Sequence, residues 1–84
     1  MSYQDLVQEY RETDWVLQNL ALLRMRQFLE FASTATRAEQ RVFFQRLVRE
    51  ERAIIQGLHQ KLDRLWYYVE QARRPGWGVA RLKE

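Results

Sequence analysis

The chain has 84 residues, of which 46 % are hydrophobic, 13 % aromatic and 30 % charged, with a formal net charge of +3 and no cysteine. This composition predicts one small folded domain, because the chain is too apolar for a disordered tail and lacks an apolar run of about 18 residues that could span a membrane. The lack of cysteine excludes disulfides and thiolate metal sites, and the N-terminal segment lacks the layout of a secretory signal, so we expect a soluble cytoplasmic protein.

The first predicted helix covers residues 3–32. Ser2 and Asp5 have the spacing of a capping box, in which a hydroxyl and a carboxylate satisfy backbone N–H groups of the first turn. With about 100° between successive residues, one face of this helix is apolar along its length and is expected to pack against a second helix. That face consists of Tyr3, Leu6, Val7, Tyr10, Leu17, Leu20, Ala21, Met25, Phe28, Phe31 and Ala32.

A second apolar set lies on another side of the same helix. Trp15, Leu22 and Leu29 recur every seven residues, and Val16 with Leu23 widens the set. One neighbouring helix cannot cover both sides, and soluble monomers rarely expose an apolar stripe of this size. The sequence therefore predicts an oligomer interface at these five residues. A homodimer whose two hairpins form a four-helix bundle is the simplest solution, and a different protein partner satisfies the same requirement.

A turn at residues 33–36 is predicted to separate the first helix from a second helix over residues 37–74. Thr36 and Glu39 repeat the capping-box pattern, and a Pro-Gly pair after the second helix begins a tail, residues 75–84, that we expect to be flexible. Because the connection is short, the predicted fold is an all-α antiparallel helical hairpin. The second helix carries a coiled-coil heptad seam of Phe44, Val48, Glu51, Ile55, Leu58, Leu62, Leu65, Val69 and Ala72.

Glu51 is the one polar residue in this seam. A buried carboxylate at such a position is costly unless it is paired, and a polar seam residue commonly sets the register or the oligomeric state. The candidate partners in the expected register are Gln18 and Asn19, with Arg24 or Arg52 less well placed.

Three consecutive aromatic residues, Trp66, Tyr67 and Tyr68, lie near the end of the second helix. Relative to the seam, the first and third lie on its two edges and Tyr67 points away. An antiparallel register around the turn places Tyr3 close to Trp66, which predicts an aromatic cluster that closes the open end of the hairpin. The alternative is a partner-docking surface, extended by Trp77 in the tail.

The outward side of the second helix carries arginines and glutamines without an intervening acid. Arginines beside an exposed aromatic ring suit a phosphate backbone and stacked bases, so nucleic-acid binding by this side is the alternative function. The arginines are Arg46, Arg49, Arg64 and Arg74, and Gln56, Gln60, Tyr67 and Gln71 complete the arc.

Catalytic and cofactor motifs are missing from the sequence. There is no nucleophile with its base and no phosphate loop, and the single histidine, His59, lacks the Glu-x-x-His spacing of di-iron bundles. We therefore expect no enzyme activity, cofactor, metal, small-molecule substrate or membrane partner. The predicted function is a non-catalytic helical oligomerisation or protein–protein interaction module that acts as a small assembly, adaptor or regulatory subunit. Whether Gly57 bends or breaks the second helix stays open.

Overall fold

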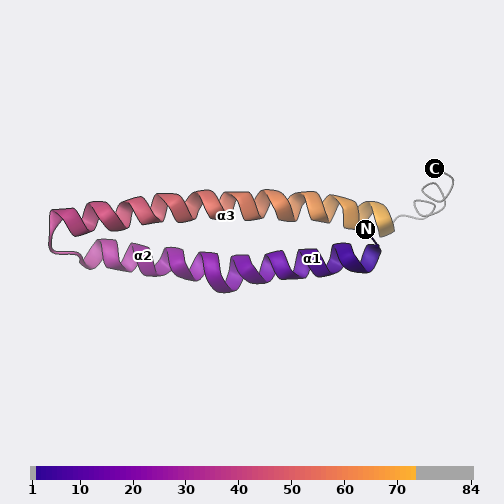
Figure 1. Ribbon diagram of the computed structural model, residues 1–84, viewed down its shortest axis with the longest axis horizontal. Helices are drawn as coiled ribbons and strands as arrows, with labels where there is room; N and C mark the ends of the chain where they lie inside the picture. Colours follow the sequence, from indigo (N-terminus) through magenta and orange to yellow (C-terminus); the bar gives the residue numbers. More distant parts are fainter. Residues whose placement is uncertain (1, 74–84) are drawn as a thin grey trace.

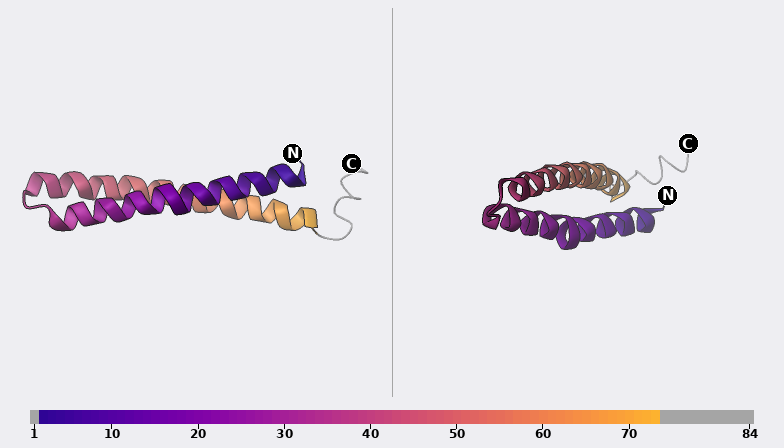
Figure 2. Two further views of the ribbon diagram at one scale, coloured as in Figure 1. Left: turned by 90° about the horizontal axis from the view of Figure 1, so that it is seen from below. Right: turned by 60° about the vertical axis from the view of Figure 1, so that its left-hand side comes forward.

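A computed structural model describes residues 2–73, which form an antiparallel helical hairpin (Figure 1). The first rod consists of α1 (Tyr3–Val16), one π-helical turn η1 (Leu17–Ala21) and α2 (Leu22–Thr34), and the second rod is α3 (Ala38–Arg73). The rods lie side by side and cross at a shallow angle (Figure 2), within extents of 64 × 17 × 16 Å. The predicted all-α hairpin is confirmed for these residues, none of whose helices is long and apolar enough to cross a membrane.

The start of α1 is the capping box that the sequence predicts. The Asp5 backbone N–H donates to Ser2 Oγ, and the Ser2 backbone N–H donates to Asp5 Oδ2, both at 3.2 Å. The Ser2 hydroxyl and the Ser2 backbone N–H both stabilise the charged Asp5 carboxylate, so the pKa of Asp5 lies below its ordinary value of 3.8. The first turn of the helix is therefore closed by its own side chains.

The connection between the rods lies later in the chain than predicted. Ser33 and Thr34 remain helical, because their hydroxyls donate to the Glu30 carbonyl at 2.9 Å instead of ending the helix. The residue before α3 is Arg37, whose carbonyl accepts from the Arg41 N–H at 3.1 Å. Arg37 thus occupies the capping position that the sequence assigned to Thr36. The later turn changes which residues of the two rods face each other.

The core lies along the seam of α3, which runs as one helix past Gly57. Every seam residue predicted for α3 is buried or half-buried. The centre of the core combines Leu17 and Ala21 of η1, which are fully buried, with Ile55 and Leu62 of α3. Tyr10, Met25 and Leu58 pack around this centre. A single layer of side chains between two rods therefore makes up the whole core of the described residues.

The π turn η1 is the feature that the sequence did not predict. The Leu22 N–H donates to the Leu17 carbonyl, five residues earlier, which is the hydrogen bond of a π-helix. Such a turn holds one more residue than an α-helical turn. Side chains after η1 therefore face about 100° away from where an unbroken α-helix would place them.

The extra residue keeps the first rod packed on α3 at both ends. Alternating steps of three and four lead through the buried or half-buried Leu6, Tyr10, Thr13 and Leu17. Continued unchanged, these steps would next reach Leu20, Arg24, Gln27 and Phe31. The residues that face α3 are instead Ala21, Met25, Phe28 and Ala32, each one position later. The prediction that Leu20 and Phe31 belong to the core is therefore wrong, and both are exposed. Tyr3, at the first position of α1, is exposed as well.

Candidate interaction surface

An ion pair between Arg24 and Glu51 joins α2 to α3. Nε and Nη2 of Arg24 each lie 3.0 Å from Glu51 Oε1. The Glu51 side chain is 7 % exposed and the Arg24 side chain 46 %, so the guanidinium closes a buried carboxylate off from solvent. Arg24 takes the place expected for Gln18 or Asn19, because the later turn sets each α3 residue opposite a later residue of the first rod.

Arg24 and Phe31 mark one side of the hairpin. Phe31 follows Arg24 by seven residues, and its ring centroid lies 5.2 Å from that of Phe44. Phe43 packs against the same ring at 5.3 Å. Three aromatic rings therefore meet where α2 and α3 approach the turn, and two of them, Phe31 and Phe43, remain about half exposed.

The same side continues towards the open end of the hairpin. Lys61 Nζ lies 3.4 Å from Glu9 Oε2, which places both residues on one flank. Val16 follows Glu9 by seven residues, and Ile54 precedes Lys61 by seven, so both share this flank. Val16, Ile54 and Leu20 of η1 extend the side that carries the aromatic rings. We term this apolar surface the aromatic flank. It comprises Val16, Leu20, Phe31, Phe43, Leu47 and Ile54.

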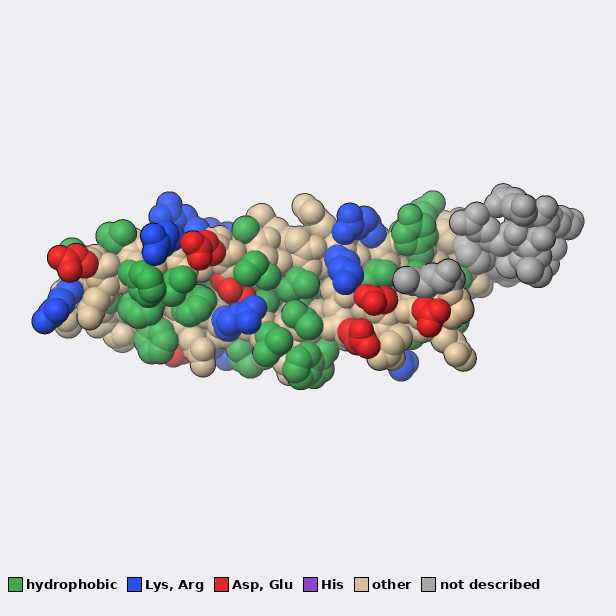
Figure 3. All heavy atoms as spheres, viewed as in Figure 1, with side chains coloured by type: hydrophobic (Ala, Val, Ile, Leu, Met, Phe, Trp, Pro, Cys, Tyr) green, Lys and Arg blue, Asp and Glu red, His purple; other side chains and the backbone are tan. Residues whose placement is uncertain are grey.

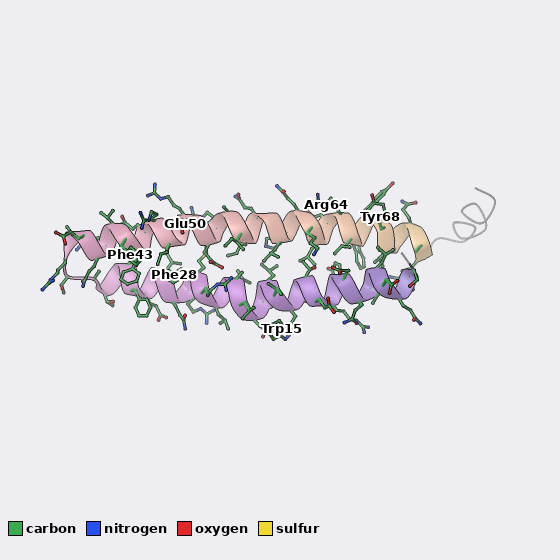
Figure 4. All side chains as sticks on the ribbon, viewed as in Figure 1. Trp15, Phe28, Phe43, Glu50, Arg64 and Tyr68 are labelled. Atoms are coloured by element: carbon green, nitrogen blue, oxygen red, sulfur yellow. The ribbon has the colours of Figure 1, made fainter. Side chains whose placement is uncertain are left out.

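Figure 3 shows how side chains are distributed over one face of the molecule. Hydrophobic side chains cover the half near the turn and the middle, whereas acidic side chains gather on α1 near the N-terminus. In the same view, Figure 4 labels Phe43, Glu50, Arg64 and Tyr68 along α3 and Phe28 on α2. Towards the open end, acidic side chains of α1 therefore replace the hydrophobic ones, while α3 carries a further hydrophobic group there.

Leu22 and Leu29 lie on the opposite flank. Residues two apart on a helix point about 200° apart, so Leu29 and Phe31 face opposite sides of α2 although they are 49 % and 48 % exposed. Trp15, which is 57 % exposed, projects from the bend at η1 away from α3 (Figure 4). Leu23 follows it by eight residues, which is one heptad plus the extra residue of η1, and so shares its outward side.

The five residues predicted as an oligomer interface are thus placed in three groups. Trp15 and Leu23 point outward, Leu22 and Leu29 lie on one flank, and the half-buried Val16 lies on the other. The first four are exposed, as expected for side chains that α3 does not cover. Their grouping into one seven-residue stripe is wrong, because η1 changes the phase between Trp15 and Leu22. The exposed Leu20, Phe31, Phe43 and Ile54 were not predicted as interface residues.

A shallow hollow lies at the open side of the aromatic flank. It has a volume of about 320 Å³. Two acids and a lysine surround an apolar floor, so the hollow suits an apolar side chain that is followed by a cation. Its lining residues are Glu9, Glu12, Thr13, Val16, Leu58 and Lys61.

Charge is distributed unequally along the hairpin. The turn half, residues 17–57, carries seven Lys or Arg against four Asp or Glu, a net charge of +3. The open half, residues 2–16 and 58–73, carries four against six, a net charge of −2. Residues 74–84, which follow the open half, add three Lys or Arg against one Glu, a net charge of +2. The turn half therefore carries the largest positive charge and repels the turn half of another copy more than its open half.

The aromatic residues near the end of α3 form two pairs. Trp66 packs on Tyr10 with ring centroids 5.8 Å apart, and Tyr67 packs edge-on against Tyr68 at 5.6 Å. The expected contact of Trp66 with Tyr3 is wrong, because the later turn brings Tyr10 opposite Trp66. All three consecutive aromatics are exposed to about half or more. Trp77, the fourth docking candidate, lies outside the described residues.

The outward arginines of α3 are also exposed. Within residues 2–73, Arg46, Arg49 and Arg64 form no ion pair. The Arg46 guanidinium lies 5.6 Å from the centre of the Phe43 ring, a cation–π contact at the edge of the aromatic flank. Arg74 lies outside the described residues.

Metal-ligating groups do not converge in the described part of the chain. No three His, Cys, Asp or Glu residues among residues 2–73 lie close enough together to hold a metal ion. What the surface offers is apolar contact area with one central ion pair. Comparison of the chain with protein-family models, with curated proteins and with solved structures finds no match.

Proposed function

We propose that the protein is a non-catalytic helical module that binds a second protein chain through the apolar surface of its first rod and the adjoining part of α3. Self-association into a four-helix bundle is the form we favour. In that role the protein acts as a small assembly, adaptor or regulatory subunit. The observation that carries the proposal is the exposure of Trp15, Leu23, Phe31 and Phe43 on rigid helices.

The exposed apolar area supports this proposal. With about 200 Å² for a large aromatic side chain, the exposed halves of Trp15, Phe31 and Phe43 present about 300 Å². Leu20, Leu23 and Ile54 raise the apolar area to about 500 Å². A standard protein interface buries about 800 Å² on each partner, of which somewhat more than half is apolar. These residues lie on two adjoining sides, the aromatic flank and the outward side that carries Trp15 and Leu23, and together they offer about the apolar area of one standard interface.

The thin core supports the proposal as well. A hairpin of two helices buries one layer of side chains, and isolated scaffolds of this size are marginally stable. Covering about 500 Å² of apolar surface would contribute about 12 kcal/mol before the cost of association is subtracted. A second chain would thus supply the stabilisation that a single hairpin lacks.

The proposal is tested by the mass of the protein in solution. Light scattering at micromolar concentration should give about twice the 10.3 kDa of one chain. Phe31→Asp places a charge on the aromatic flank and should return the mass to that of one chain. Gln60→Ala, a change at an exposed residue on the outward side of α3, is the matched control and should leave the mass unchanged. A wild-type chain that stays monomeric would refute self-association.

A second candidate function is nucleic-acid binding by the outward side of α3. It is favoured by the absence of ion pairs at Arg46, Arg49 and Arg64 within the described residues. Such binding would weaken steeply with salt and would be lost when the three arginines are replaced by glutamate. An affinity for single-stranded DNA or RNA that is independent of salt would count against it.

A further inference from the structure

We infer that two copies of this chain pack antiparallel through their aromatic flanks, about a two-fold axis beside the Arg24–Glu51 ion pair. This inference rests on the proposed self-association and specifies its face, direction and register. A two-fold interface must be self-complementary, so that each residue on one side of the axis meets a suitable residue from the other side. The aromatic flank has this property.

Apolar residues of the first rod lie at matching distances from the ion pair. At about 1.5 Å per residue, Phe31 lies about 10 Å from Arg24 towards the turn. Val16 lies about 10 Å from Arg24 in the opposite direction, after allowance for the extra residue in η1. An antiparallel second copy therefore places its Phe31 over Val16, at the edge of the hollow between α1 and α3.

Residues of α3 are spaced in the same symmetrical way. Leu47 and Ile54 lie on either side of Glu50, three and four residues away, so that each meets the other in the second copy. Phe43 and Gly57 lie seven residues from Glu50 on either side. The second copy's Phe43 therefore lies over Gly57, where the helix has no side chain.

This contact gives Gly57 a role that the single chain does not explain. Glycine is unfavourable in the interior of a helix, and α3 is otherwise free of glycine. A Cβ atom added at Gly57 would meet nothing within 4 Å in the described chain. The surface beside Gly57 is therefore open in one hairpin. In the dimer, the aromatic ring of the second copy's Phe43 occupies it.

Charge favours the antiparallel direction over the parallel one. The antiparallel arrangement sets the turn half of each copy, with a net charge of +3, against the open half of the other, with −2. A parallel pair would set +3 against +3. Near the axis, Arg24 binds Glu51 through Nε and Nη2, which leaves Nη1 for the second copy's Glu50. The two Glu50 carboxylates that meet at the axis thus each have an arginine beside them.

The first experiment replaces Gly57 by glutamine. Glutamine favours the helix and meets nothing in the single chain, so helicity and monomer stability should rise or stay unchanged. The same side chain would collide with the second copy's Phe43, and self-association should weaken about tenfold or more. Ala53→Gln, on the outward side of α3, is the matched control and should leave self-association unchanged. A dimer that is unaffected by Gly57→Gln overturns the inference, while the proposed self-association survives.

The second experiment uses the lack of native cysteine. Glu50→Cys and Arg64→Cys are fourteen residues apart, exposed and in the same helical phase on α3 (Figure 4). In the antiparallel arrangement the two copies of residue 50 meet at the axis, whereas the two copies of residue 64 are about 40 Å apart. A short thiol cross-linker should therefore join the Glu50→Cys chains only. Cross-linking of both variants indicates a parallel pair, and cross-linking of neither places the interface elsewhere; either result overturns the inference.

Discussion

Deletion of Leu20 tests the role of η1 in packing the hairpin. Without this residue, the positions that face α3 follow one uninterrupted heptad pattern from Leu6 to Ala32. The same side chains stay buried and the π turn becomes a regular α-helical turn. Because the deleted side chain does not pack against α3, the packing within one hairpin should be kept. At a concentration where both proteins are monomeric, we expect the melting temperature to change by no more than a few degrees.

A matched deletion of Gln56 in α3 should have the opposite effect. Gln56 is also exposed, but the α3 seam is already regular, so its removal turns half of the seam about 100° away from the first rod. Leu62, Leu65 and Val69 would lose their contacts, at about 1.5–3 kcal/mol each. The total, about 6 kcal/mol, is comparable to the whole stability of a small domain.

Circular dichroism during thermal and urea unfolding measures both deletions. The solution mass is determined alongside, because the melting temperature of an associating protein depends on its concentration. We predict that the Leu20 deletion melts cooperatively near the wild-type temperature and that the Gln56 deletion is largely unfolded. If both deletions lower the melting temperature equally, η1 does not accommodate one extra residue in the first rod.

Three further predictions concern single side chains. Arg24→Ala leaves a buried carboxylate without its partner and should destabilise the hairpin by about 1–3 kcal/mol in urea unfolding, whereas adding Glu51→Leu should restore the loss. Phe31→Asp should abolish self-association, whereas Leu29→Asp, equally exposed on the opposite flank, should leave the mass unchanged. The pKa of Asp5 is lowered by folding, so its contribution to stability is present above its unfolded pKa and disappears as the pH falls through the lower folded value; an NMR titration of Asp5 measures this.

Each of these predictions has an outcome that contradicts it. A double variant no more stable than Arg24→Ala would mean that the lost stability is not the cost of an unpaired carboxylate. Loss of the dimer in Leu29→Asp but not in Phe31→Asp, with helicity retained in both, would move the interface to the opposite flank. An Asp5 carboxyl that titrates at its ordinary pKa in the folded chain would mean that the capping box does not persist in solution.

The seam of α3 could be predicted from the sequence because a single helical period holds over its whole length. Val48, Ile55 and Leu62 recur in register, and Gly57 falls outside the seam, so nothing disturbs the pattern. The capping box at Ser2 could be predicted for a similar reason, since it depends only on residues within one turn.

The first rod could be predicted only in part, because its period changes once. A helical wheel assumes one phase throughout, and it therefore assigned Leu20 and Phe31 to the core and grouped Trp15 with Leu22. The signal was nevertheless present, since the phase of Leu6, Tyr10 and Leu17, continued unchanged, leads to Arg24 and Gln27. Two polar residues in succession on a core face indicate a change of phase.

The partner of Glu51 depended on the position of the turn. The sequence predicts Ser33 and Thr34 as turn residues, because such side chains compete with helical hydrogen bonds. In the structure they donate to the Glu30 carbonyl and remain helical, which moves the turn towards α3. The connection lies at residues 35–37 and not at 33–36, which sets each α3 residue opposite a residue three positions later in the first rod. Arg24, one helical turn further on, then reaches Glu51.

Small-angle X-ray scattering of the full chain tests the central claim, that the apolar surface is covered by a second copy, most directly. We predict a particle with the mass of two chains, a thicker cross-section and a length of about 80 Å against the 64 Å of one hairpin, because the axis at Glu50 lies about 8 Å from the middle of α3. A particle with the mass and cross-section of a single hairpin at micromolar concentration would contradict the claim.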